Sequence, residues 1–113
     1  MNHVIDATNQ KLGRLASQIA IILQGKMTAD YEPRLSGNDR VTIKNISKIV
    51  ITGNKEDQKT YHHHTGYMGH LKTKTYKQVF AEKPEKVLWR AVFNMLPKNR
   101  LRQKRLNRLV IEK

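Results

Sequence analysis

The feature that most constrains the fold is a run of apolar side chains with helical spacing. In residues 12–23 they recur every three or four positions, as on one wide face of a helix. These positions are Leu12, Leu15, Ala16, Ile19, Ala20, Ile22 and Leu23. Gly25 follows, where a left-handed glycine commonly ends a helix. Because a helix with one apolar face must cover another apolar surface, we expect a layered domain.

Segments typical of strands lie on both sides of this helix. Val4 and Ile5 predict a short first strand, and residues 40–44 alternate with the period of two that predicts another. The continuous β-branched run at residues 49–52 predicts a strand buried on both faces, in a central position. Two further short strands are predicted at residues 59–63 and 110–111.

The second half of the chain is mainly helical. Residues 75–82 place Tyr76, Val79 and Phe80 on one face. Pro84 suits the first turn of the next helix, and Pro97 ends its apolar stripe. That stripe comprises Val87, Leu88, Ala91, Val92, Met95 and Leu96, with Trp89 and Phe93 expected to widen the buried face. Asn45 is expected to cap a single turn over residues 46–48, and Asn99 a basic C-terminal helix.

Alternating strands and helices predict one α/β domain over residues 1–113. We expect a small central sheet of about four strands, flanked by helices in three layers, with the basic helix at the end. The chain has no cysteine for a disulfide or a thiolate metal site. No apolar run approaches the roughly 20 residues of a membrane helix, and the first residues lack a signal-peptide pattern, so we expect a cytoplasmic protein.

The charge of the chain predicts a polyanionic partner. Lys and Arg number 22 against 9 Asp and Glu, giving a formal net charge of +13. Nucleic acid is the favoured partner, bound largely through counterion release. A membrane surface would require a basic amphipathic helix with exposed bulky apolar residues. The two long apolar stripes are needed for the core, so no membrane partner is expected.

Residues 61–70 are rich in His, Tyr and Gly and contain no carboxylate. Glycines let the backbone approach a phosphate closely, while Tyr and His can stack on an unpaired base or donate to phosphate and 2′-hydroxyl oxygens. For Tyr61, packing against the sheet edge and RNA contact both stay open. The RNA-binding residues predicted here are His63, His64, Thr65, Gly66, Tyr67, Gly69, His70, Lys72 and Lys74.

The C-terminal segment is the second predicted RNA contact. Its basic side chains are distributed around the whole circumference of a helix and leave little room for an apolar face. Such a helix is more stable when bound to a polyanion than in water, which favours RNA contact over simple solvation. They are Lys98, Arg100, Arg102, Lys104, Arg105 and Arg108. Secondary candidates for RNA contact are Arg14, Lys26, Arg34, Lys55 and Lys59.

The histidines also invite a metal or catalytic interpretation, which the sequence disfavours. Adjacent side chains of an extended segment point to opposite faces, so consecutive histidines do not readily share one metal. A nuclease would usually need carboxylates, and the nearest, Glu56 and Asp57, lie in an ordinary turn. We therefore predict no enzyme, catalytic residue, metal, cofactor or small-molecule substrate. A small metal-dependent nuclease stays as a remote alternative.

A set of short motifs runs in order along nearly the whole chain. They are Asp6-Ala7-Thr8 with Leu12-Gly13-Arg14-Leu15-Ala16-Ser17, Gly25-Lys26, Tyr31-Glu32-Pro33, Thr52-Gly53-Asn54-Lys55, His64-Thr65-Gly66-Tyr67 and Met95-Leu96-Pro97-Lys98-Asn99. Together they resemble the ribosomal protein L-thirteen family of the large subunit. The chain departs from that family at Asn94 and Arg102, where glycine is usual, and at His70, where a second glycine usually follows Gly69. The aspartate-rich Gly-Asp turn that usually precedes the second strand appears here as Gly37-Asn38-Asp39. Bacterial members commonly continue with a His-containing tail, and we expect this chain to be a reduced or divergent member without it.

The resemblance implies a structural constituent of the large ribosomal subunit. It implies contacts with large-subunit rRNA and with neighbouring large-subunit ribosomal proteins, a role early in subunit assembly, and no catalysis. An RNA-binding regulator that acts outside the ribosome stays open as an alternative.

Overall fold

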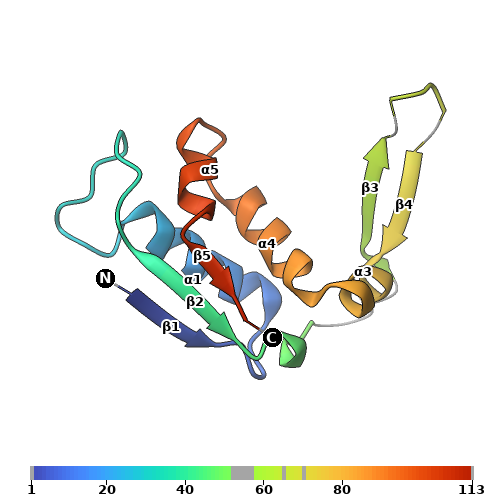
Figure 1. Cartoon of the computed structure of the whole chain (residues 1–113), viewed down its shortest axis with the longest axis horizontal. Coiled ribbons are helices and arrows are strands. Elements are labelled where there is room, and N and C mark those ends of the chain that lie inside the picture. The colour runs from blue at the N-terminus through green and yellow to red at the C-terminus, as the bar shows by residue number, and fades with distance from the viewer. Residues whose placement is uncertain (1, 52–57, 65, 70, 113) are drawn as a thin grey trace.

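Three parallel strands form the main sheet of the computed structural model, which describes residues 2–51, 58–64, 66–69 and 71–112. The central strand β2 (Arg40–Lys44) pairs with β1 (Asn2–Asp6) on one side and β5 (Leu109–Ile111) on the other. Figure 1 shows α1 (Leu12–Gln24) and α4 (Pro84–Met95) behind this sheet and α5 (Leu101–Leu106) above it. The predicted α/β class, a small sheet flanked by helices, is confirmed.

The first helix forms as its apolar spacing predicts. Its buried face includes Leu15 and Ile19, and it ends at Gly25, whose φ of 83° lies in the left-handed region. The N–H of Gly25 donates to the carbonyls of Ile21 and Ile22, which satisfies the last turn. The predicted glycine stop is therefore confirmed.

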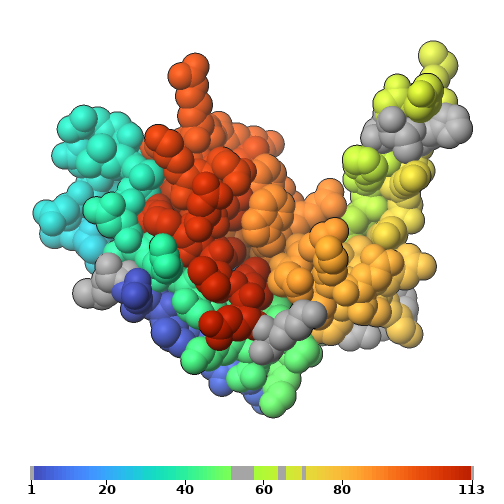
Figure 2. All heavy atoms as spheres, in the orientation of Figure 1, coloured from blue at the N-terminus to red at the C-terminus, as the bar shows by residue number. Residues whose placement is uncertain are grey.

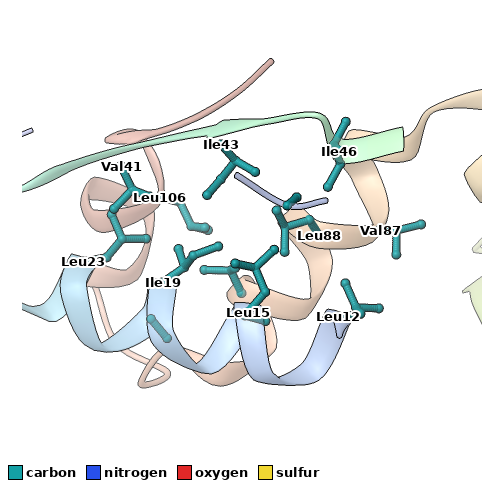
Figure 3. Packing of buried hydrophobic residues seen from close by; sticks show 14 of the residues in the cluster. Leu12, Leu15, Ile19, Leu23, Val41, Ile43, Ile46, Val87, Leu88 and Leu106 are labelled. Carbon is teal, nitrogen blue, oxygen red and sulfur yellow. The ribbon is translucent and has the colours of Figure 1, made fainter. Parts of the chain in front are cut away.

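The core lies between β2 and the helices. Val41 and Ile43 of β2 face α1 (Figure 3), and the buried side chains of α4 and α5 complete the cluster. Burying one aliphatic side chain of this size contributes about 1.5–3 kcal/mol to folding. The labelled core residues are Leu12, Leu15, Ile19, Leu23, Val41, Ile43, Ile46, Val87, Leu88 and Leu106.

The predicted central strand at residues 49–52 is wrong over its described part, residues 49–51. Val50 forms only an isolated bridge with Lys11, and its side chain is 38% exposed. Its N–H donates to Gln10 O over 2.9 Å, and its carbonyl accepts from Leu12 N over 3.0 Å. The backbone of this run therefore forms its hydrogen bonds with residues at the start of α1 and not with a strand of the main sheet. The main sheet has three strands, fewer than the four or so expected. Residue 52 lies outside the described residues.

A helical turn redirects the chain before that run. Asn45 has a φ of 59° and precedes the 3₁₀ turn η1 (Ile46–Lys48), which confirms the predicted turn. The predicted side-chain cap is wrong, because Asn45 Nδ2 instead donates to Asp6 Oδ1 over 3.1 Å. This bond links the ends of β2 and β1.

A separate two-stranded hairpin stands away from the main body (Figure 1). Strand β3 (Thr60–His64) was predicted from the sequence, whereas its antiparallel partner β4 (Leu71–Thr75) was not. Residues 71–75 alternate lysine and threonine after a single leucine and are largely exposed. They carry no apolar period that would mark a strand.

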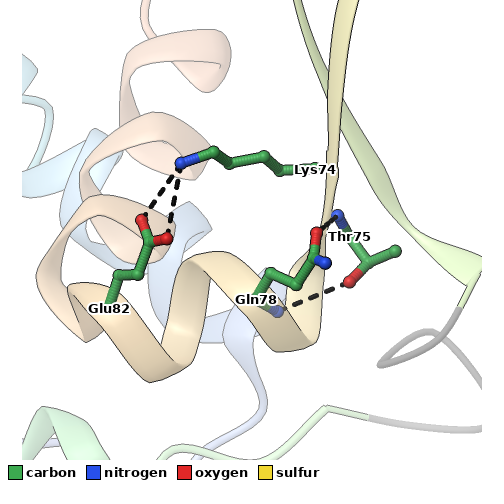
Figure 4. Close-up of polar contacts among 4 residues, drawn as sticks. All are labelled: Lys74, Thr75, Gln78 and Glu82. Carbon is green, nitrogen blue, oxygen red and sulfur yellow. Dashed lines mark hydrogen bonds and ion pairs between the residues drawn. The ribbon is translucent and has the colours of Figure 1, made fainter.

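The hairpin runs directly into helix α3 (Tyr76–Glu82) through a capping box (Figure 4). Gln78 N donates to Thr75 Oγ1 over 3.4 Å, and Thr75 N donates to Gln78 Oε1 over 3.1 Å. Lys74 of β4 reaches Glu82 of α3, with 3.2 Å between Nζ and Oε2. These contacts fix the direction in which the hairpin leaves the helices.

The predicted helix boundaries after the hairpin are confirmed. Pro84 begins α4, and the extended residue Leu96 follows it, directly before Pro97. Asn99 Oδ1 accepts from Leu101 N over 3.0 Å, which supports its predicted capping role at α5. Within the described ranges, no helix is both long enough and apolar enough to cross a bilayer.

Candidate nucleic-acid interface

The hairpin presents two chemically different faces. Its register pairs Tyr61 with Lys74 and His63 with Lys72. Since side chains alternate along a strand, these four share one face and His62 lies on the other. The face that carries Tyr61 turns toward α4, because the Arg90 guanidinium carbon lies 5.0 Å from the centre of the Tyr61 ring.

Tyr61 packs between the hairpin and the body. It is half-buried, and Lys59 Nζ lies 5.9 Å from its ring centre, in addition to the Arg90 contact. Burial raises the pKa of the Tyr61 phenol above its ordinary value, while the Arg90 charge opposes that rise. The sequence left packing against the sheet edge and RNA contact open for Tyr61; the structure shows it packed against α4, and RNA contact stays a prediction.

On the opposite face, His62 is held by hydroxyl groups. Its Nδ1 lies 3.1 Å from Thr73 Oγ1 and its Nε2 lies 3.2 Å from Thr60 Oγ1. His63 is exposed on the face that turns toward α4. Among the residues that the structure describes, no three His, Asp or Glu side chains gather closely enough to hold a metal ion.

The tip of the hairpin is apolar, aromatic and exposed. Gly66 and Gly69 have φ values of 92° and 79°, a region that glycine adopts without the strain of a Cβ. Between them, the side chains of Tyr67 and Met68 are 74% and 97% exposed. Of the predicted site residues, Thr65 and His70 lie outside the described residues, as does the side chain of His64.

A groove of about 520 Å³ separates the hairpin from α3 and α4. Figure 2 shows this hollow between the projecting hairpin and the body. Two predicted RNA-binding lysines line it from β4, Lys72 and Lys74. The helical side supplies Lys83, Lys86, Trp89 and Arg90, with Glu82 as the one acid among the described lining residues.

Two aromatic rings and a guanidinium form a stack along α4 and α5. Trp89 and Phe93 lie parallel, with ring centres 5.2 Å apart and planes 14° apart. The Arg102 guanidinium carbon lies 3.7 Å from the Phe93 ring centre. The expectation that Trp89 widens the buried face is wrong, since Trp89 is 41% exposed; Phe93 is half-buried as expected.

Apart from Arg102, which is half-buried against Phe93, the C-terminal basic residues divide into two groups. Lys98, Arg100 and Lys104 are exposed, as the sequence predicts. Arg105 is only 2% exposed, and its Nη2 donates to Leu35 O over 3.1 Å and Pro33 O over 3.4 Å. The expectation that basic side chains surround a solvent-facing helix is therefore wrong at Arg105.

Arg108 is the other internal arginine. Its Nη1 donates to Asp39 O and its Nη2 to Leu23 O, each over 2.8 Å, and Nη2 also donates to Ser36 O. Burial lowers the pKa of Arg108, and the Arg105 charge adds to that effect while Asp39 opposes it. RNA contact by Arg105 and Arg108 stays a prediction, but both guanidinium groups already hold backbone carbonyls.

The secondary candidates are spread over the surface. Arg14, Lys26 and Lys59 are exposed, and Arg34 pairs with Glu32 over 2.8 Å. The remaining secondary candidate, Lys55, lies outside the described residues. Of the described candidates, Lys59 lies beside the hairpin, with its Nζ 5.9 Å from the centre of the Tyr61 ring.

Sequence reasoning missed the helical side of the groove. Lys86 and Arg90 lie one turn apart on α4, and Trp89 follows Lys86 by three positions, which places all three on neighbouring surface. All three are exposed. The sequence does contain an indication of this surface, because Trp89 and Arg90 lie away from the apolar stripe of the helix.

Comparisons with known proteins give one consistent family. The family model for ribosomal protein L13 matches residues 1–111. Relatives in several bacteria carry the name large ribosomal subunit protein uL13. That of Clostridioides difficile is 46% identical over 95% of this chain and 75% of its own length. Those of Chloroflexus aurantiacus and Thermotoga maritima are each 47% identical over 96% of this chain, and 76% and 73% of their own lengths.

Proposed function

The chain belongs to the ribosomal protein L13 family, and on that premise we propose that it is a structural constituent of the large ribosomal subunit that binds large-subunit rRNA. The observation that carries this proposal is the projecting hairpin with its basic groove, on a chain of net charge +13. A domain that bound no polyanion would gain nothing from such a concentration of like charge.

The tip of the hairpin is the first proposed contact. Tyr67 offers an exposed aromatic ring for stacking on an unpaired base, and Gly66 and Gly69 bring the backbone close to the RNA. His63 and Lys72 lie opposite one another on the strands below and supply donors to phosphate oxygens. The proposal extends to His64, Thr65 and His70 from the family motif alone.

The exposed cations around α5 are the second proposed contact. Lys98, Arg100 and Lys104 have their charged groups free to approach phosphates, which favours binding by counterion release. Arg105 and Arg108 act behind them in this proposal. They fix the loop at residues 33–39 and the start of β5, and so position the surface on which the exposed cations lie.

In this proposal the protein is a scaffold that stabilises converging RNA segments early in subunit assembly, beside neighbouring ribosomal proteins. Specificity comes from the shape of the folded RNA and not from a sequence that is read out. No step of the proposed function requires a metal, a cofactor or a catalytic residue. The ribosome is also the site at which the protein would reside in the cell.

Sedimentation of a cell lysate tests the proposal. The tagged chain should migrate with the large subunit at moderate salt. Recovery only in the light fractions would instead favour a regulator that acts outside the ribosome. A second measurement addresses the nuclease alternative, because RNA cleavage that a chelator stops and His63→Ala abolishes would contradict a scaffold role.

A further inference from the structure

Trp89 is an aromatic surface held rigid at the edge of the groove. It is the single tryptophan of the chain, and Phe93 stacks against it while Arg102 caps Phe93. An exposed indole that contacts only solvent would move between rotamers. The stack with Phe93 instead fixes the plane of the Trp89 ring before a ligand binds. Pre-organisation of this kind reduces the entropy lost on binding.

Cations line the same groove as this ring. Lys83 and Lys86 are exposed on the helical side of the groove, and Lys72 faces them from the hairpin. The charge of Lys74 is partly neutralised by Glu82, whose carboxylate lies 3.2 Å away. The groove therefore combines a flat apolar surface with exposed positive charge, which matches the two chemical parts of a nucleotide.

We propose that the groove receives one unpaired RNA nucleotide, with its base stacked on Trp89 and its phosphates bound by Lys83 and Lys86. This inference rests on the proposed function, since it names the RNA feature that the same protein would bind. The volume of about 520 Å³ falls within the range of pockets that enclose small ligands, about 300–1,000 Å³. In an RNA double helix the paired bases are stacked on one another and expose only their edges. An exposed indole ring therefore selects an unpaired base, whose face is accessible.

An acidic peptide is the competing occupant. Its carboxylates would satisfy Lys83 and Lys86 but would leave the indole face without a matching flat group. A nucleotide uses both the ring and the cations, and for this reason the structure favours it. The two occupants make different predictions for the fluorescence of Trp89, because a stacked base quenches an indole and a glutamate side chain does not stack on it.

The test uses the full chain and two RNA hairpins that differ by one bulged adenosine. Because Trp89 is the single tryptophan, its emission reports on this groove alone. We expect the bulged RNA to quench the emission and the fully paired RNA to leave it nearly unchanged. Trp89→Ala should weaken binding of the bulged RNA about tenfold or more, and Trp89→Phe should restore much of the loss.

A matched pair of charge variants separates the groove from general electrostatics. Lys83→Gln with Lys86→Gln should weaken binding of the bulged RNA more than Lys44→Gln with Lys48→Gln, which removes the same charge from exposed positions near the sheet. Circular dichroism of each variant confirms that it is folded. Equal losses for the two pairs would overturn the proposal.

Failure of this inference is distinguishable from failure of the proposed function. If the chain sediments with the large subunit but Trp89 emission and the Trp89→Ala affinity do not change, the groove inference is wrong and the ribosomal function stands. If a polyglutamate peptide shifts Trp89 emission at concentrations where the bulged RNA does not, the occupant is an acidic segment and the inference is again overturned. Absence of the chain from the large subunit contradicts the proposed function itself.

Discussion

The guanidinium of Arg108 donates to the carbonyl oxygen of Leu23 over 2.8 Å and so joins the start of β5 to the end of α1. The same group also holds the carbonyls of Ser36 and Asp39. Gly37 lies in this loop with a φ of 81°, a left-handed conformation that glycine adopts without the strain of a side chain. One basic side chain thus closes the long loop between α1 and β2.

Replacing Arg108 should destabilise the fold. Arg108→Ala removes the donors from three backbone carbonyls, and we expect the free energy of unfolding to fall by about 1–3 kcal/mol in urea denaturation. Arg108→Lys should recover little of this loss, because one ammonium group cannot reach the three carbonyls as a planar guanidinium does. Arg100→Ala, at an exposed position, is the control and should change stability by less than about 0.5 kcal/mol. Equal effects at the two positions would refute the bracing role.

The exposed cations of the C-terminal segment should govern the salt dependence of RNA binding. Arg100→Ala with Lys104→Ala should lower the slope of log affinity against log salt by somewhat under about two units, one for each lost phosphate contact. Arg40→Ala with Lys44→Ala removes equal charge from exposed ends of β2 and should leave the slope nearly unchanged. An unaltered slope in the first variant would mean that its side chains are only solvated.

Removing Glu82 should strengthen RNA binding. Glu82→Gln takes away the one acid among the described lining residues of the groove and frees Lys74, with which it pairs at 3.2 Å. Both side chains are exposed, so the free energy of unfolding should change by no more than about 1 kcal/mol. Fluorescence anisotropy with a labelled RNA should show a rise in affinity of several-fold. Glu112→Gln makes the same charge change at the end of the sheet, and an equal rise there would show that only net charge matters.

Asp6 should contribute to the loss of stability in acid. Its carboxylate accepts hydrogen bonds from Thr8 Oγ1, Thr8 N and Asn45 Nδ2 at 2.7, 2.9 and 3.1 Å, and they lower its pKa to about 2. Because the pKa is lower in the folded state than the ordinary 3.8, this contribution is present above the ordinary value and is lost as the pH falls toward 2.

The measurement is the urea midpoint of unfolding at a series of pH values. Between about pH 5 and pH 2 the midpoint of the unaltered chain should fall more steeply than that of Asp6→Asn. Asp30→Asn, at an exposed acid in the loop after α1, is the matched control. Parallel curves for the unaltered chain and Asp6→Asn would contradict this role of Asp6.

The elements that the sequence predicts well are those whose apolar period is strong. Helices α1 and α4 and strand β2 follow from spacing alone, because one face of each is buried against the same core. The run at residues 49–52 misled the prediction because β-branched residues favour extended backbone, and extended backbone need not join a sheet. An extended segment joins a sheet only where the neighbouring backbone groups belong to another strand. Here the backbone groups that bond to the run belong to Gln10 and Leu12.

The candidate site was only partly predictable for a different reason. His63, Tyr67 and Lys72 were identified from residue type, and the structure places them together on one hairpin. Residue type cannot show that Arg105 is buried while Arg100 is exposed, since both lie in the same basic segment. The partners of Arg105 are carbonyls of residues 33 and 35, which only the tertiary fold brings near.

The order of strands in the main sheet determines when the fold can be completed. β2 lies between β1, which precedes it, and β5, which comes far later in the chain. During synthesis the first two strands and α1 can assemble early, but one edge of β2 stays open until β5 has been made. Contacts between such distant segments are slow to form. Because Arg108 directly precedes β5, one short segment supplies both the last strand of the sheet and the side chain that braces the loop at residues 33–39.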